Sequence, residues 1–563
     1  MHRPPDQPRP SLYYDYRVHL PWLPSAHAGA QRHRVVVVGS GPAGMVTALE
    51  LARHGVGCVL LEAELQVSQG SRAIVFTRRS MEILQQVGVD RPMSANGLPW
   101  RFGNSFYRGQ CVFRMEAPHD EDDRFWPMLN VQQQYMEQYL YEACCAQPLI
   151  DFRWGNKLVQ VRQDEHSATL EVDTPEGPYT IVTDWLVAAD GGRSGLRAAL
   201  DLKLEGASYE GLFVIADIRI DLPYPTERRA YFDPDWNRGN TILMHREPHG
   251  IWRIDYQLPA GESPEQALQP DSIKSRIDAQ LAMIGHGGTP WAMDWCSVYS
   301  ARALTLPDYR HGRTLFTGDA AHLLPIFGVR GANTAFQDAQ ALGWQLAYVV
   351  NGLAGPRLLQ NYSAERVGAA REIIEEAGKS TRFMTPPSRG FRLLRDAVLS
   401  LSLTQPFVRP LYHWRTSRPH EYTHSMLNAP ADDSAHFSDG PGPGAPPRNV
   451  RLADDDFLLD HLGGGFDLLF FTSGAGLPEA VQRELAEQRA AGVPVRVTAI
   501  GAAPPVTGAD RSLPDAHGRC RQRWGVPADG AAYLLRPDQH VCARWLTLDA
   551  ARLRRALQQA LPR

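Results

Sequence analysis

The feature that most constrains the fold is a glycine-rich turn directly after a run of four valines. Residues 35–38 read VVVV, a continuous β-branched run typical of a parallel strand buried on both faces. The residues that follow, GSGPAGMVTALELARHG, predict a tight turn and an amphipathic helix, and CVLLEA at 58–63 predicts the next strand. This order indicates a β-α-β unit at the start of a doubly wound α/β domain.

The turn carries a dinucleotide-binding fingerprint. It matches the pattern G-x-G-x-x-G through Gly39-Ser40-Gly41-Pro42-Ala43-Gly44, and Glu62 ends the next strand. Glycines let backbone N–H groups approach a pyrophosphate at the positive end of a helix, while the acid accepts hydrogen bonds from ribose hydroxyls. We therefore expect these residues to bind a dinucleotide, although the fingerprint alone does not separate NAD from FAD.

A second acidic turn lies far downstream, in TLFTGDAAHLLPIFGVRGANTAF at 314–336. Gly318 and Asp319 end an apolar run, and Gly331-Ala332-Asn333 opens a helix. FAD is long, so its far half needs other parts of the chain: an aspartate for the ribityl hydroxyls and a helix N-terminus for the pyrimidine edge of the flavin. A simple dehydrogenase has no use for these features, so they favour FAD.

With these motifs in order, the chain resembles the FAD-dependent aromatic hydroxylases, single-component flavoprotein monooxygenases of the p-hydroxybenzoate hydroxylase fold. The resemblance covers roughly residues 30–400 and rests on the fingerprint with Glu62, on DWLVAADGGRSGLR at 184–197 and on TLFTGDAAHLLP at 314–325. Smaller matches are Arg72 in SRAIVFTRRSMEIL, which resembles the arginine near the flavin, and Gln133 in QQYMEQYL, which resembles a cofactor-contacting glutamine.

The resemblance implies that NADH or NADPH reduces FAD, that O2 reacts with the reduced flavin, and that a C4a-hydroperoxyflavin hydroxylates an aromatic, phenolic small molecule. It places Asp190 and Gly191 between FAD and the path of the nicotinamide nucleotide. It also places Arg72 and Pro325 at the flavin ring, as catalytic residues. His322 is expected to be a packed residue rather than a base.

One departure from the family pattern concerns the turn before the helix that faces the flavin. The family often has Gly-Gln-Gly there, whereas this chain has Val329-Arg330-Gly331. Two directions are open for the Arg330 side chain: toward the cofactor, where it adds positive charge, or toward solvent.

Candidate substrate residues come from a predicted hairpin at 241–258 and the strand before it. In this fold a second sheet forms the roof of the aromatic pocket, which nominates Tyr231, His245, Arg246, Arg253 and Tyr256. Strand alternation puts His245 and Arg246 on opposite faces, so at most one of them points into the pocket. For each residue a surface or sheet-packing role is the alternative.

The domain organisation follows from the same patterns. We expect an α/β fold class: a Rossmann-like FAD-binding domain, an antiparallel-sheet substrate domain and a C-terminal α/β domain that resembles the thioredoxin-like appendage of the phenol and 3-(3-hydroxyphenyl)propionate hydroxylase branch. That last domain includes LLRPDQHVCARW and lacks C-x-x-C, so a packing or dimer role is expected rather than redox chemistry. The expected boundaries are 1–30 for an N-terminal extension, 31–205 with 300–428 for the discontinuous FAD-binding domain and its helical tail, 206–299 for the substrate domain, 429–447 for a linker and 448–563 for the C-terminal domain.

Composition limits the partners. The 563 residues are 43% hydrophobic and 21% charged with a formal net charge of −4, and no basic patch suggests nucleic acid or a membrane as partner. Seven scattered cysteines, no signal-like start and no long apolar run predict a cytoplasmic protein with free thiols. No metal site is expected, and a homodimer is expected by resemblance only.

Two other functions fit the same motifs. One is an FAD monooxygenase acting on a heteroaromatic, indole-like ring or on a polyketide-like substrate, because fold does not fix substrate. The other is a non-oxygenating FAD protein that sequesters an aromatic intermediate for a partner.

Overall fold

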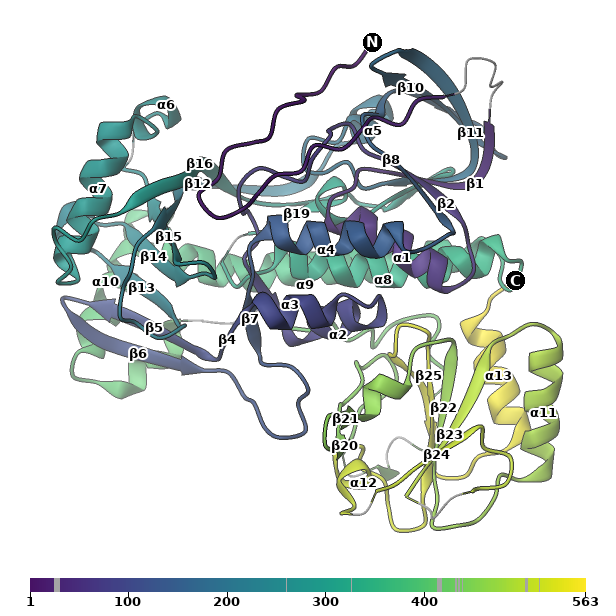
Figure 1. Ribbon diagram of the computed structural model, residues 1–563. Coiled ribbons are helices and arrows are strands. Elements are labelled where there is room, and N and C mark those ends of the chain that lie inside the picture. The colour runs from purple at the N-terminus through teal and green to yellow at the C-terminus, as the bar shows by residue number, and fades with distance from the viewer. Residues whose placement is uncertain are drawn as a thin grey trace.

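The computed structural model describes residues 1–24, 31–259, 261–325, 327–412, 418–430, 433, 436–437, 439–501, 505–515 and 517–563. Parts of the predicted N-terminal extension (25–30) and of the predicted linker (431–432, 434–435 and 438) therefore lie outside the described residues. Figure 1 shows a central α/β body, an antiparallel sheet on its left side, and a C-terminal α/β body at lower right.

The central body is built on a mostly parallel sheet. β1 (Gln31–Val38) lies between β2 (Cys58–Leu61) and β11 (Gly177–Ala188) and runs parallel to both, which confirms the β-α-β start. The four valines 35–38 are at most 7% exposed, as expected for a strand covered on both faces. The remaining strands of this sheet are β8 (Ile150–Arg153), β9 (Lys157–Gln163), β10 (Ala168–Thr174), β17 (Arg310–His311) and β18 (Thr314–Phe316).

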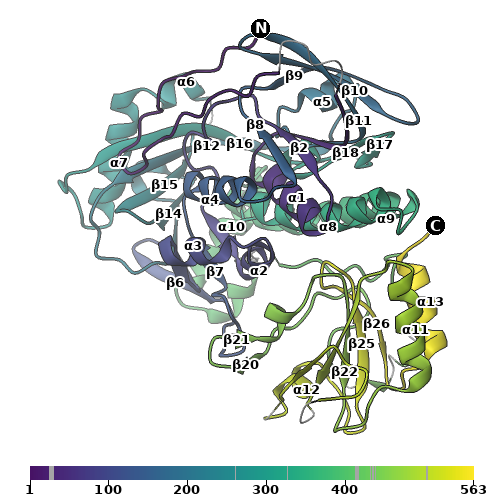
Figure 2. The same cartoon turned by 45° about the vertical axis from the view of Figure 1, so that its right-hand side comes forward.

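Three helices from distant parts of the sequence pack together beside this sheet. α1 (Pro42–Arg53) starts with a proline, whose fixed φ suits the first helical position. It contacts α4 (Gln133–Cys145) and α8 (Gly331–Val350), and α8 in turn contacts the long α9 (Arg357–Met384). Figure 2 shows α1, α4 and α8 side by side below the parallel strands. Smaller neighbours are α2 (Arg78–Gln86), α3 (Asp90–Asn96), α5 (Gly195–Ala199) and the three-stranded sheet of β3 (Val75–Thr77), β7 (Met128–Asn130) and β4 (Leu98–Trp100).

The second body is an eight-stranded sheet in the order β19-β16-β12-β15-β14-β13-β5-β6. Helix α7 (Pro270–Met283) covers one of its faces through Ile273, Ile277 and Leu281. The predicted hairpin is present, with β14 and β15 paired antiparallel. The strands are β5 (Phe102–Tyr107), β6 (Gln110–Glu116), β12 (Glu205–Arg219), β13 (Arg228–Phe232), β14 (Thr241–Arg246), β15 (Ile251–Gln257), β16 (Ala292–Thr305) and β19 (His322–Leu323), with α6 (Pro264–Ala267) before α7.

This sheet includes more of the chain than the sequence indicated. β5 and β6 come from a segment that we assigned to the FAD-binding domain, and β13 pairs with β5 in parallel. The connection between β5 and β13 is long, and local sequence patterns do not reveal pairing between strands so far apart in the chain.

The C-terminal body has a mixed five-stranded sheet in the order β24-β23-β22-β25-β26. Its central strand β22 pairs in parallel with β23 and antiparallel with β25, and α11 packs on α13 beside it. The elements are β20 (Arg451–Ala453), β21 (Asp456–Phe457), β22 (Phe466–Phe471), α11 (Glu479–Ala490), β23 (Val495–Ile500), β24 (Arg511–Leu513), α12 (Arg519–Arg523), β25 (Ala531–Leu535), β26 (Val541–Trp545) and α13 (Ala550–Ala560). The thioredoxin-like relationship of this body stays a prediction.

The N-terminal segment 1–24 packs on the molecule as an extended strap. Tyr14 and Tyr16 are 7% and 6% exposed and pack in one cluster with Trp154. Arg9 forms an ion pair with Glu64 at 2.7 Å. Apolar burial and this ion pair therefore hold the strap in place.

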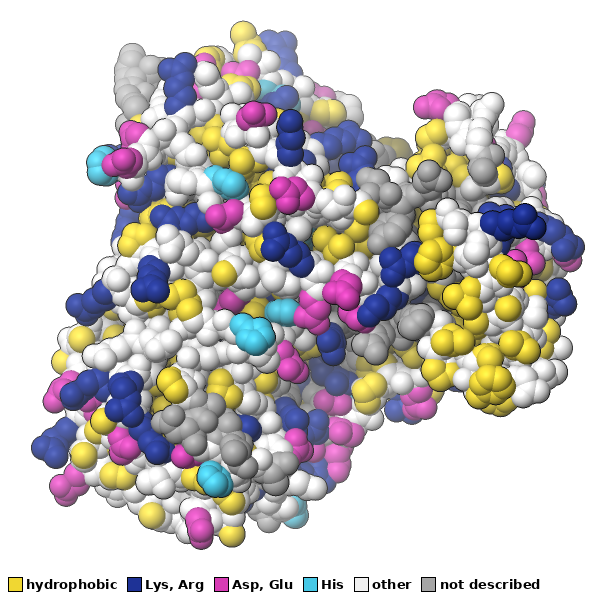
Figure 3. All heavy atoms as spheres, turned by 180° about the vertical axis from the view of Figure 1, so that it is seen from behind, with side chains coloured by type: hydrophobic (Ala, Val, Ile, Leu, Met, Phe, Trp, Pro, Cys, Tyr) yellow, Lys and Arg dark blue, Asp and Glu magenta, His cyan; other side chains and the backbone are white. Residues whose placement is uncertain are grey.

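The surface carries charges of both signs. On the face in Figure 3, Lys and Arg side chains are interspersed with Asp and Glu, and a group of hydrophobic side chains lies on the right-hand lobe. Exposed apolar residues of α10 (Arg389–Ser402) and the following 3-10 helix η3 (Pro406–Tyr412) include Leu393 at 71% and Phe407 at 75%. Within the described residues, every helix is too short or too polar to cross a bilayer.

Candidate FAD and substrate site

The fingerprint glycines pack directly against the end of β11. A Cβ atom on Gly39 would lie 2.4 Å from the carbonyl oxygen of Ala189, and one on Gly44 would lie 1.9 Å from that of Gly39. Backbone atoms cannot move aside as a flexible side chain can, so both positions require glycine. The fingerprint is thereby locked against the residue that precedes Asp190.

The second acidic turn meets the fingerprint from the other side. A Cβ atom on Gly318 would lie 2.8 Å from the Cβ of Ala43 and 3.4 Å from that of Ala335 in α8. Tertiary packing thus brings together motifs that are some 280 residues apart in the sequence, as an extended cofactor requires.

Space for a pyrophosphate exists at Gly41. No described atom lies within 4 Å of a Cβ built there, in contrast to Gly39 and Gly44. Gly41 is also the N-cap of α1, and no side chain of the described residues caps this helix. The N–H groups of its first turn are therefore available for an anion.

Glu62 faces the same turn from the end of β2. Its Oε2 accepts hydrogen bonds from the Ser40 amide at 2.9 Å and the Ser40 hydroxyl at 2.7 Å. Its Oε1 also accepts the Glu64 amide at 2.9 Å. A carboxylate has about four acceptor positions, so about one is left for a ribose hydroxyl. The residues at this turn fit the adenosine half of FAD.

Asp319 and Arg72 are both exposed, although the region around them is largely buried. Protein enclosure raises the pKa of Asp319 above its usual range, and the positive charges of His322 and Arg72 oppose that rise. The acid and the arginine therefore lie within electrostatic reach of each other. Contact of Asp319 with the ribityl chain and of Arg72 with the flavin ring stays a prediction.

Asp190 caps a short helix. Its carboxylate accepts a hydrogen bond from the Ser194 hydroxyl at 2.6 Å and from the Leu196 amide at 3.0 Å, at the start of α5. Gly191 next to it has no described atom within 4 Å of a built Cβ. The Asp190 side chain thus has a structural task, and contact of Asp190 and Gly191 with a nucleotide stays a prediction.

Arg197 joins the motif around Asp190 to the motif around Asp319. It donates to the carbonyl of Gly192 at 2.7 Å and to that of Ala320 at 3.0 Å. The two segments therefore hold a fixed relative position.

Gln133 and Asn333 both tie loops together through their side chains. Gln133 accepts hydrogen bonds from the amides of Arg72 and Ala73 at 3.2 and 3.0 Å and donates to Glu137 at 2.7 Å.

The side-chain oxygen of Asn333 accepts hydrogen bonds from Thr77 and Ser80. Its side-chain NH2 group donates to the carbonyls of Val75 and Val329. These side chains position the Arg72 loop and the start of α8. Direct contact with the cofactor stays a prediction for both residues.

The segment from Pro325 to Gly331 leads into α8. Pro325 is buried, and Val329 has a positive φ of 57°, which is strained for a β-branched residue. Arg330 is 5% exposed and donates to the carbonyl of Phe327 at 3.3 Å, so the solvent-facing alternative is wrong. No described side chain caps the α8 N-terminus. Contact of the Gly331 and Ala332 amides with the flavin stays a prediction.

The antiparallel sheet divides the predicted substrate residues between its two faces. Tyr231 and Tyr256 belong to the apolar cluster formed with α7. Arg246 has the strand parity of Met244 in that cluster and donates to the Tyr224 carbonyl at 2.8 Å. All three side chains thus lie on the face toward α7, and we remove them from the candidate pocket. Alternation alone does not say which face a helix covers.

His245 and Arg253 lie on the inner face, toward the flavin motifs. Arg253 donates to the carbonyl of Ser71, next to Arg72, which fixes the direction of this face. Arg253 also pairs with Asp217 at 2.8 Å and lies 3.4 Å from Glu247, so its charge is neutralised within the protein. We therefore interpret Arg253 as a structural ion-pair residue and His245 as part of the pocket wall.

Further polar residues of the inner face were missed from the sequence. They are Ser105 on β5, Arg228 on β13, Asp255 on β15 and Tyr299 on β16. Buried side-chain atoms on this face without a hydrogen-bond partner in the described chain include Ser105 Oγ, His245 Nδ1 and Asp255 Oδ1. Asp255 has the strand parity of Arg253, which is the one signal that could have found it.

Comparisons with known proteins agree with this geometry. The family model described as FAD binding domain matches residues 32–377. A 3-(3-hydroxy-phenyl)propionate/3-hydroxycinnamic acid hydroxylase of Mycolicibacterium smegmatis is 28% identical over 448 residues, 77% of this chain and 76% of its own. A protein of the same name from Paraburkholderia xenovorans is 31% identical over 372 residues, 65% of this chain and 58% of its own.

Solved structures share the fold. The flavin-dependent monooxygenase PieE, in complex with FAD and substrate, superposes with a TM-score of 0.78 at 23% identity and covers 94% of this chain and 100% of its own. A ternary complex of aklavinone-11 hydroxylase with FAD and aklavinone has a TM-score of 0.76 at 24% identity and covers 95% of this chain and 100% of its own. Together with the converging motifs, the family match over more than half of the sequence shows that the chain belongs to the FAD-binding family of flavin-dependent monooxygenases.

Proposed function

We propose that this protein hydroxylates a phenolic small molecule, with FAD as cofactor, NADH or NADPH as reductant and O2 as co-substrate. FAD, when bound and reduced, supplies the oxygen-transferring chemistry. The chain's own residues bind FAD and the phenolic substrate, orient them toward each other and exclude water. The observation that carries the substrate class is the set of unpartnered polar atoms on the inner face of the antiparallel sheet.

The substrate would lie between this face and the loops that surround the flavin site. Arg253 connects the sheet to Ser71 beside Arg72, and the ring of Phe213 packs edge-on against Phe327 at 5.4 Å. These contacts hold the sheet and the two loops together. Phe213 and Leu243 would offer apolar contacts to an aromatic ring.

Asp255 would accept the hydrogen of the phenol hydroxyl. Burial raises the pKa of Asp255 to about 7, with Asp217 adding to the rise and Arg253 and Arg228 opposing it. A carboxylate with a pKa near neutrality suits proton acceptance, and withdrawing the phenol proton makes the ring more electron-rich. The unpartnered Asp255 Oδ1 is the atom that would receive the hydrogen bond.

Arg228 and Tyr299 lie within electrostatic reach of Asp255. Burial raises the pKa of Tyr299, and the charge of Asp255 raises it further. Burial lowers the pKa of Arg228 to about 10. A buried arginine beside an acid would favour a substrate whose phenolate or second substituent carries negative charge.

We further propose a cytoplasmic location and a homodimer, which fractionation and light scattering would test.

The test compares Asp255→Asn with Tyr256→Phe, which alters the same strand on the opposite face. A panel of phenols, hydroxybenzoates and hydroxyphenylpropionates is used to measure NAD(P)H oxidation and product. We expect one class to stimulate turnover, Asp255→Asn to lower kcat/KM by about 10²-fold or more and to remove its rise with pH near 7, and Tyr256→Phe to change little. Equal effects of the two substitutions would contradict the assigned face, and stimulation by indoles alone would favour a heteroaromatic substrate.

A further inference from the structure

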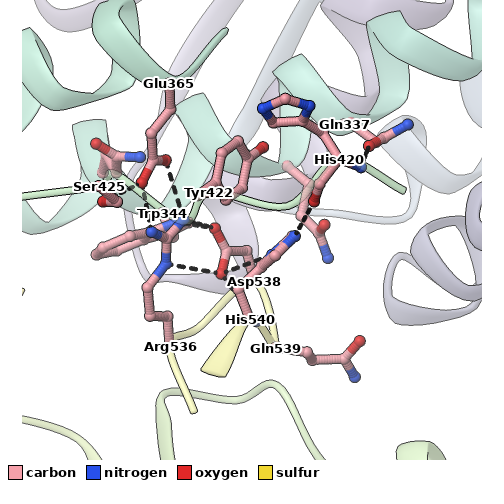
Figure 4. A network of polar contacts seen from close by, with 12 residues as sticks. Gln337, Trp344, Glu365, His420, Tyr422, Ser425, Arg536, Asp538, Gln539 and His540 are labelled. Atoms are coloured by element: carbon pink, nitrogen blue, oxygen red, sulfur yellow. Dashed lines mark hydrogen bonds and ion pairs between the residues drawn. The ribbon is translucent and has the colours of Figure 1, made fainter. Parts of the chain in front are cut away.

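One hairpin turn of the C-terminal body is buried against the helices of the FAD-binding body. The turn 536–540 joins β25 to β26, and Arg536, Asp538 and His540 are 0%, 1% and 3% exposed. Figure 4 shows these side chains pointing toward α8 and α9. The sequence of this turn, within LLRPDQHVCARW, has no role in the function proposed so far.

Arg536 connects this turn to α9. Its guanidinium donates to both carboxylate oxygens of Glu365, at 2.6 and 3.1 Å, and also to Asp538 at 3.1 Å (Figure 4). Bidentate arginine–carboxylate pairs fix orientation as well as distance. Burial of the set means that the loss of one partner leaves an uncompensated charge.

The turn is tied to α8 and α2 as well. The indole of Trp344 donates to Asp538 at 3.0 Å. Arg79 donates to the carbonyl of Asp538 at 2.9 Å and to Gln340 of α8 at 3.1 Å. One turn of the C-terminal body thus contacts three helices of the FAD-binding body.

The residue after Glu365 continues this network toward the flavin site. Arg366 donates to Asp338 at 2.5 Å and to the Tyr422 hydroxyl at 2.7 Å, and the ring of Tyr422 lies 4.6 Å from that of His540. Asp338 in turn is 2.6 Å from His322 Nε2.

Asp338 also accepts the amide of Gly318, at 3.3 Å, next to Asp319. Burial opposes ionisation of Asp338, but the charges of Arg366 and His322 overcome it and hold the pKa of this acid below its usual range. The charge of His322 also opposes the rise in the pKa of Asp319 that burial causes. An ionised Asp338 therefore anchors the segment that carries the expected ribityl ligand.

We propose that the turn Arg536–His540 is a positioning element for FAD. By fixing Glu365, Arg366 and Tyr422 it sets the place of Asp338, and through Asp338 the place of His322 and the Gly318–Asp319 backbone. The C-terminal body then contributes to cofactor affinity although it touches no cofactor itself. This inference depends on FAD binding and is independent of the substrate.

The test uses the full chain and three variants. Tyr422→Phe removes one hydroxyl of the network, Arg536→Lys removes the bidentate pair, and Leu513→Ala removes a buried side chain of the C-terminal body remote from the network. For each we measure the unfolding midpoint, the Kd for FAD of the apoprotein by flavin fluorescence, and the visible spectrum and reduction potential of the bound flavin.

We expect Tyr422→Phe and Arg536→Lys to weaken FAD binding by about tenfold and to shift the spectrum or potential. Leu513→Ala should lower the unfolding midpoint with an unchanged Kd and spectrum. If the network variants behave as Leu513→Ala does, the contact is structural only and the proposal is overturned. If Arg536→Lys does not fold, Tyr422→Phe decides alone, because an unchanged Kd and spectrum there overturns the proposal.

Discussion

Two glycines of the fingerprint should respond differently to the same substitution: Gly44→Ala should lower stability, and Gly41→Ala should weaken FAD binding. Gly44→Ala places a methyl group 1.9 Å from a backbone oxygen, so α1 must shift. Overpacking of this kind costs about 1–3 kcal/mol of folding free energy. Gly41→Ala places its methyl group in open space at a φ of −66°, which alanine adopts without strain.

For Gly41→Ala the expected change in stability is close to zero. Loss of a glycine N-cap costs a few tenths of a kcal/mol, and reduced freedom of the unfolded chain returns about as much. FAD binding should suffer instead, because the methyl group occupies the space of the pyrophosphate. Losing two charge-assisted hydrogen bonds of about 1.5 kcal/mol each corresponds to roughly a 100-fold weaker Kd.

The assays are urea unfolding of the apoproteins and titration with FAD. We expect Gly44→Ala to lower the free energy of unfolding and Gly41→Ala to leave it unchanged while weakening FAD binding. Unchanged FAD affinity in Gly41→Ala would show that the pyrophosphate lies elsewhere. Wild-type stability in Gly44→Ala would refute the close packing between the fingerprint and α1.

Three further substitutions test other parts of the account. The folded-state pKa of Asp255, about 7, exceeds the unfolded value of about 3.9, so the free energy of unfolding should fall by on the order of 1–4 kcal/mol as pH rises from about 4 to about 7. Urea unfolding of Asp255→Asn should not show this fall. Arg253→Ala leaves Asp217 and Glu247 buried without their cation and should cost about 3–5 kcal/mol, whereas Arg246→Ala on the other face should cost less than about 1 kcal/mol; similar costs would refute the assigned faces. Val329→Gly relieves a left-handed conformation, which offsets its lost apolar packing, so the free energy of unfolding should change by less than about 1 kcal/mol, and a loss of more than about 2 kcal/mol would show that Val329 is not strained.

The cofactor site was readable from the sequence because its signals are local. A strand, a glycine turn and a helix follow one another around Gly39. Around Asp319, β18 leads into a 3-10 turn at Gly318–Ala320, and α8 begins a few residues later at Gly331. The structure adds that Ala43, Gly318 and Ala335 meet, which chain order alone does not give.

The substrate wall was only partly readable. Alternation correctly separated His245 from Arg246, yet nothing local tells which face α7 covers, so Tyr231 and Tyr256 were misplaced. Asp255 was overlooked although it has the parity of Arg253. The buried direction of Arg330 and the contact between Arg536 and Glu365 depend on segments that meet only in the folded chain.

The most direct test of the central claim is stopped-flow absorbance of the FAD-loaded protein with NADH and with NADPH, with and without the phenol panel, followed by product analysis under isotopically labelled O2. The account predicts that one phenol class speeds flavin reduction and that the product carries one labelled oxygen atom. If neither nucleotide bleaches the flavin with any ligand, the monooxygenase activity is contradicted, and an FAD protein that sequesters its aromatic ligand becomes the better description.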